Sequence, residues 1–98
     1  MKTPITKSEI NEVKEAISSI SNAIAKEGGL YVPSDSQTDA LKALFSETYG
    51  TIGEREYGRF ANYLMQVDMH NLNASQSIIA EESHLEAIEN ALALVEAV

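Results

Sequence analysis

Apolar residues recur every three or four positions in the first third of the chain. The spacing of Ile10, Val13, Ile17, Ile20 and Ile24 is 3, 4, 3 and 4, which is the period of one helix face. Thr6-Lys7-Ser8-Glu9 has the capping-box form, in which a hydroxyl and a Glu three residues later satisfy free main-chain amides. Gly28-Gly29 then supplies a left-handed stop. Together these features predict a helix over about residues 7–27.

Two further helices are predicted in the middle of the chain. Ser34-Asp35-Ser36 offers several N-caps, of which Ser36 has Asp39 suitably spaced for a capping box. Apolar residues from Ala40 to Phe45 follow, which predicts a helix over about 37–48. Thr51-Ile52-Gly53-Glu54 again has the capping-box form and predicts the start of a helix over about 52–70. The residues of that helix expected to face the core are Tyr57, Phe60, Leu64 and Val67.

The boundary before the last helix lies in the segment from Asn71 to Ser75. Asn and Ser favour turns and caps because their side chains compete for main-chain hydrogen bonds. Asn73, with Gln76 three residues later, predicts a separate last helix over about 74–97. The alternative is one continuous helix over 52–97, because an apolar heptad register crosses the segment and neither Gly nor Pro follows Gly58.

We favour the break, which predicts an all-α fold in which residues 1–98 form a single small bundle of about four helices. The continuous helix would instead require a dimer or a larger assembly. The last predicted helix also has a second face of small residues, including Ala87 and Ala91. A helix that is apolar on two sides lies either at the centre of its own bundle or against another chain.

Charge is distributed unevenly along the chain, whose formal net charge is −8. No Lys or Arg follows Arg59, although six carboxylate residues do. Such a surface repels phosphate backbones and anionic lipid headgroups, so we expect no direct nucleic-acid or membrane binding. The chain has no Cys and no apolar run long enough to span a bilayer, and it begins without an apolar signal segment, so we expect a cytoplasmic location.

Few residues are arranged for chemistry. Glu81 and His84 have the Glu-x-x-His spacing of di-iron bundles, but such sites need a second pair and two further Glu residues. The glycines from Gly50 to Gly58 lack the Gly-Lys-Ser/Thr ending of a phosphate loop, and no predicted strand precedes them. We therefore expect no catalytic residue, no metal site and no cofactor, and we predict that the protein is not an enzyme.

Partner binding is the remaining class of function. All Tyr and Phe residues lie between positions 31 and 63, and Tyr and Arg are frequent in protein interfaces. Four Glu residues of the last helix, Glu82, Glu86, Glu89 and Glu96, also line up on one face, with no Lys or Arg on that helix to pair with them. The predicted partner-binding residues are Tyr31, Tyr49, Arg55, Tyr57, Arg59, Tyr63, Glu82, Glu86 and Glu89.

Three functions fit this pattern. The first is a non-enzymatic protein–protein interaction module that acts by binding another protein. The second is a small acidic inhibitor, of the type made by phages and mobile elements, which blocks a basic nucleic-acid-binding host protein. The third is a self-assembling structural subunit, a homo-oligomer joined through the first helix or through a long C-terminal helix.

Overall fold

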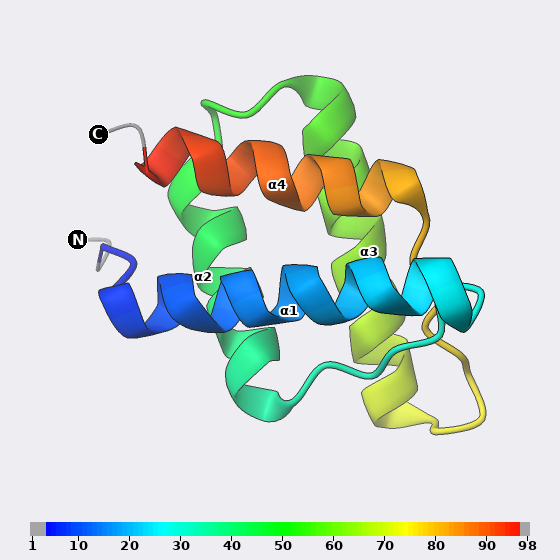
Figure 1. Cartoon of the computed structure of the whole chain (residues 1–98). Coiled ribbons are helices and arrows are strands. Elements are labelled where there is room, and N and C mark those ends of the chain that lie inside the picture. The colour runs from blue at the N-terminus through cyan, green and yellow to red at the C-terminus, as the bar shows by residue number, and fades with distance from the viewer. Residues whose placement is uncertain (1–3, 97–98) are drawn as a thin grey trace.

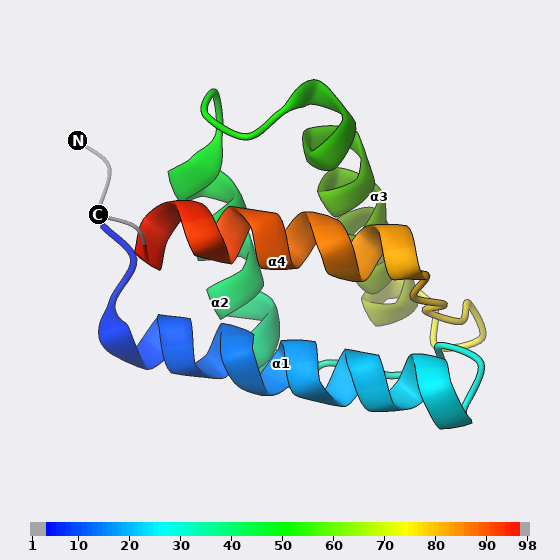
Figure 2. The same ribbon diagram turned by 45° about the horizontal axis from the view of Figure 1, so that its top comes forward.

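Two antiparallel pairs of helices cross each other (Figure 1). In this computed structural model, which describes residues 4–96, the helices are α1 (Lys7–Lys26), α2 (Asp35–Thr48), α3 (Glu54–Leu72) and α4 (Glu82–Glu96). Helices α1 and α4 lie side by side in front of α2 and α3, and the turned view of Figure 2 keeps the same order. Residues 4–96 contain four helices and no strand, which confirms the predicted all-α bundle.

The first helix has the predicted cap. The Thr6 hydroxyl accepts from the Glu9 amide at 3.1 Å, and the Glu9 carboxylate accepts from the Thr6 amide at 2.9 Å. The predicted stripe is only partly buried, because the centre of the buried helix face is shifted toward Ala16 and Ala23. The buried residues of α1 are Val13, Ala16, Ile20 and Ala23.

Two predicted helix starts are wrong by about two residues. Helix α2 is capped by Ser34 with Gln37, rather than by Ser36 with Asp39, so the helix begins at Asp35. Helix α3 begins at Glu54 after Gly53, which makes no side-chain cap. The hydroxyl of Thr51, the predicted cap, instead donates to the Thr48 carbonyl oxygen at 2.9 Å and stabilises the end of α2.

The predicted break after α3 is confirmed, which excludes the continuous helix, but α4 begins at Glu82 and not near residue 74. The Asn73 side chain accepts from the Ser75 amide at 3.2 Å, so this Asn closes a turn instead of starting a helix. The following residues are extended and are held by contacts with distant parts of the chain. The Ile79 amide donates to the Gln66 side chain, and the Ala80 amide donates to the Gly29 carbonyl oxygen.

A histidine completes the start of α4. The Glu81 carbonyl oxygen accepts from the amides of His84 and Leu85, and His84 Nδ1 accepts in return from the Glu81 amide at 2.9 Å. His84 therefore takes the position that Glu or Gln holds in a capping box. Its Nε2 lies 2.9 Å from the Asn62 side-chain oxygen of α3, so the same ring ties α4 to α3.

Helix α4 contacts each of the other three helices. Ala87 and Ala91, on the second face of small residues, are buried within the chain's own bundle. The predicted end at residue 97 lies outside the described residues. Within the described residues, no helix is both long and apolar enough to cross a membrane.

Candidate functional site

Three aromatic rings meet where α2 ends and α3 begins, and we call Phe45, Tyr49 and Tyr57 the aromatic corner. The Phe45 and Tyr57 rings are stacked with centroids 5.0 Å apart, and the Tyr49 ring meets Tyr57 edge-on at 5.6 Å. Phe45 also contacts the buried ring of Phe60 edge-on at 5.1 Å. The corner is therefore a continuous column of rings that runs from the core to the surface.

The outer end of this column is open to solvent. Tyr49 is 65% exposed and Tyr57 is 37% exposed. The prediction that Tyr57 faces the core is therefore wrong: it is a surface residue whose ring contacts Phe45. Next to the two rings is a hollow of about 340 Å³, lined by Tyr49, Gly50, Ile52, Glu54 and Tyr57. The corner thus combines exposed aromatic area with a recess that can accept a side chain.

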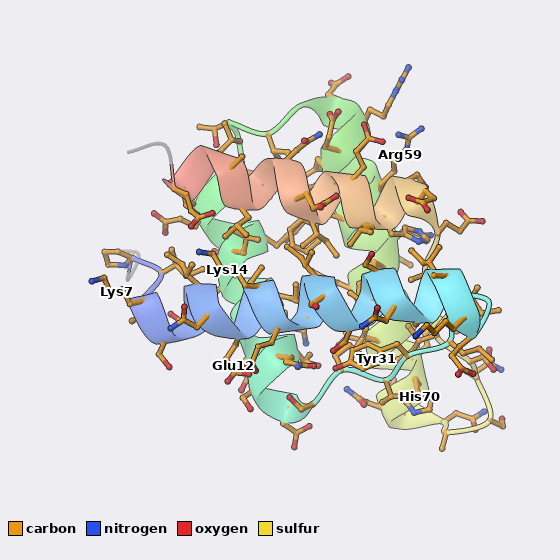
Figure 3. All side chains as sticks on the ribbon, in the orientation of Figure 1. Lys7, Glu12, Lys14, Tyr31, Arg59 and His70 are labelled. Atoms are coloured by element: carbon orange, nitrogen blue, oxygen red, sulfur yellow. The ribbon has the colours of Figure 1, made fainter. Side chains whose placement is uncertain are left out.

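The two predicted arginines point elsewhere. Each is two positions from Tyr57 on α3, and residues two apart on a helix do not share a face. Arg55 is exposed, whereas Arg59 is half-buried and lies close enough to His84 to affect the pKa of its ring. Figure 3 shows Arg59 near the first turn of α4. The structure therefore does not join the arginines to the aromatic corner.

Two predicted tyrosines are also separate from the corner. The Tyr31 ring is partly buried, and its hydroxyl donates to the Gln37 side-chain oxygen at 2.5 Å, next to the start of α2. Tyr63 is fully buried, so the prediction that it contacts a partner is wrong. The spacing of α3 allowed the core face to centre on Tyr57 or on Tyr63, and the packing of α4 against Tyr63 decides between them.

The three predicted glutamates share the exposed face of α4, and we call Glu82, Glu86 and Glu89 the acidic strip. The ion pairs of the described residues are Lys14–Glu96 and Lys42–Asp68, each at 2.8 Å. Glu96, the fourth glutamate of the predicted line, is therefore paired with α1, whereas the three glutamates of the strip are in neither ion pair. The strip is therefore an anionic surface without a counter-charge from the described residues.

The Glu81-x-x-His84 pair is not arranged as a metal site. Both ring nitrogens of His84 are engaged, one by the Glu81 amide and one by Asn62. Burial lowers the pKa of His84; the Glu81 carboxylate opposes this shift and the Arg59 guanidinium adds to it. Within residues 4–96, no three His, Cys, Asp or Glu side chains are grouped to hold a metal ion.

One exposed surface was missed by the sequence analysis. Met65 is 60% exposed, Met69 51% and Leu72 90%, and their spacing of 4 and 3 places them in one row on α3. This row could have been found as a second apolar period beside the core period of the same helix. We call it, with Gly58 and Ala61 at its N-terminal end, the α3 outer face.

Comparisons with protein-family models, curated proteins and solved structures found no match to this chain.

Proposed function

We propose that this protein is a non-enzymatic protein–protein interaction module that binds another protein through the aromatic corner. The observation that supports it is the exposure of Tyr49, a residue that is 65% exposed while its ring contacts Tyr57 and, through Tyr57, Phe45. A group of exposed aromatic residues, in contrast to a single exposed apolar residue, is the kind of surface that marks a binding site.

The support beneath the ring favours binding. Tyr has few rotatable bonds, so burying it against a partner costs little conformational entropy. The edge-on contact with Tyr57 restricts the Tyr49 ring further before a partner arrives, and this preorganisation lowers the cost of association. The adjacent hollow of about 340 Å³ offers a recess for one side chain of the partner.

Binding from a native-host extract tests the proposal. The wild-type chain, the Tyr49→Ser variant and a Leu30→Ser control are each immobilised, and the proteins that they retain are compared. Leu30 is 54% exposed and lies outside the corner, so its substitution removes exposed apolar surface at another place. We expect a protein that the wild type and the control retain and that Tyr49→Ser loses; equal retention by all three chains would refute the proposal.

The acidic strip supports a second candidate, an inhibitor that occupies the basic nucleic-acid site of a partner. Glu82, Glu86 and Glu89 are exposed without a cation from the described residues, and the whole chain carries a net charge of −8. Binding of this kind would weaken steeply with added salt, and replacing all three glutamates by glutamine would reduce that dependence. Salt-insensitive binding of the partner would contradict this candidate and would leave the aromatic corner as the contact.

A further inference from the structure

The α3 outer face has a bulky half and a small half. Met65, Met69 and Leu72 form the bulky half, and all three are more than half exposed. Gly58 and Ala61 continue the same row toward the N-terminus of the helix. Methionine is common at binding surfaces because its flexible thioether adapts to the surface that it contacts.

The glycine in this row is not needed by the fold of the chain. Gly58 lies inside α3, where glycine destabilises a helix relative to alanine, and its φ is not among the positive values. Among the residues that the structure describes, nothing lies within 4 Å of a Cβ built on Gly58. Neither its conformation nor its packing against the described residues requires a glycine at position 58, so the space above it is open to another molecule.

The α3 outer face is also nearly free of charge, although the whole chain is strongly acidic. Between Gly58 and Leu72, the side chain of Asp68 is paired with Lys42 at 2.8 Å, and Arg59 lies on the side of α4. Two copies of a chain with a net charge of −8 repel each other at most orientations. A contact through this face, unlike one through the acidic strip, does not bury unpaired carboxylates of either copy.

We infer that the α3 outer face binds the same face of a second copy, with the two helices antiparallel about a twofold axis at Met65. Gly58 and Leu72 are equally far from Met65 along α3, and so are Ala61 and Met69. An antiparallel copy therefore sets Leu72 of each chain over Gly58 of the other, and Met69 over Ala61. The bulky half of one chain fills the space that the small half of its partner leaves open.

This order of residues favours a second copy over an unrelated helix. An isologous contact requires one patch to be complementary to itself. A face with a bulky half and a small half meets that requirement when the second helix runs antiparallel, because each bulky half then lies over a small half. The interface spans about four helix turns, so it belongs to the small, reversible class. The inference does not depend on the proposed function, because it concerns a different face and needs no other protein.

Sedimentation equilibrium over micromolar to millimolar concentrations tests the inference on the full chain. Gly58→Leu places a side chain where Leu72 of the other copy lies, and Leu72→Ala removes that leucine. Each change occurs twice in a symmetric dimer, so we expect each to weaken association about tenfold or more. The double variant, Gly58→Leu with Leu72→Ala, again places a bulky residue over a small one. We expect its dissociation constant to return to within about threefold of the wild-type value.

The folding stability of the variants shows whether Gly58 and Leu72 act in association or in the fold of the single chain. Both sites face solvent within the chain, so we expect all these variants to fold, as circular dichroism can show. Gly58→Ala should raise the melting temperature of the monomer while it weakens association, because alanine favours the helix but obstructs close approach. Screening of the two net charges should also strengthen the wild-type dimer as salt is added.

Leu30→Ser removes an exposed apolar side chain elsewhere and should leave association unchanged. The inference is overturned if the wild type is monomeric at every concentration and salt level, or if the double variant fails to recover. It is also overturned if Leu30→Ser weakens association while Gly58→Leu does not. A failed pull-down by the aromatic corner would leave all these outcomes unaffected.

Discussion

Lowering the pH should destabilise the fold through His84 in particular. The ring is 5% exposed at the start of α4, and its Nδ1 faces the Glu81 amide. An amide can only donate, so Nδ1 accepts and carries no hydrogen, while Nε2 carries the hydrogen and donates to Asn62 at 2.9 Å. Adding a proton to Nδ1 would bring the Nδ1 hydrogen against the hydrogen of the Glu81 amide, and that amide would lose its acceptor.

The direction of the effect follows from the pKa of His84, which burial lowers below its ordinary value of 6.5. The unfolded chain therefore binds this proton at a higher pH than the folded chain does. The stability is fully present above about pH 6.5 and is lost as the pH falls from there toward the lowered value. One proton of difference changes the free energy of unfolding by at most about 1.4 kcal/mol per pH unit.

Urea denaturation between pH 8 and pH 5, on the wild type and on His84→Gln, would measure this contribution. Glutamine is a usual residue at this position of a capping box, so it can accept from the Glu81 amide but does not titrate. Carboxylates shared by both chains cancel in the comparison. We expect the wild type to lose stability more steeply than the variant below about pH 6.5. Parallel curves, or a ring that titrates above 6.5 by NMR, would refute the reasoning.

Three other substitutions test the packing. Tyr63→Phe should be neutral or stabilising by about 1 kcal/mol in urea denaturation, because the buried hydroxyl has no partner within residues 4–96; a clear loss would show that this hydroxyl is bonded. Gly29→Ala should cost about 3 kcal/mol or more, because φ is +89° and the new Cβ would overlap the Ala80 carbonyl oxygen; an unchanged melting temperature would contradict this contact. Lys42→Met should change stability by less than about 1 kcal/mol, because its ion pair with Asp68 is solvent-exposed, and a larger calorimetric loss would contradict that estimate.

Local signals were sufficient where a helix is defined by its own residues. The start of α1 could be predicted because Thr6 and Glu9 complete a cap within four residues. The start of α4 could not, because residues 76–81 are kept out of the helix by Gln66 and Gly29, which are far away in sequence. The cap there was also hidden, since His84 serves in the place of the usual glutamate.

The candidate site was predicted in part for the same reason. The concentration of aromatic residues pointed to the region between positions 31 and 63, which includes the aromatic corner, but helical spacing alone could not separate the buried Tyr63 from the surface residue Tyr57. That choice depends on where α4 packs. The α3 outer face was missed because only one apolar face was assigned to α3. The exposure of Met65, Met69 and Leu72 depends on where the other helices pack, which the sequence pattern does not give.

Photo-cross-linking in cells of the native host tests the central claim, binding through the aromatic corner, most directly. A photoreactive amino acid is placed at position 49 in one chain and at position 15, an exposed site on α1, in a control chain. We predict a discrete adduct with a second, different protein from position 49 and none from position 15. An absence of such an adduct at position 49, or equal adducts at both positions, would contradict the account.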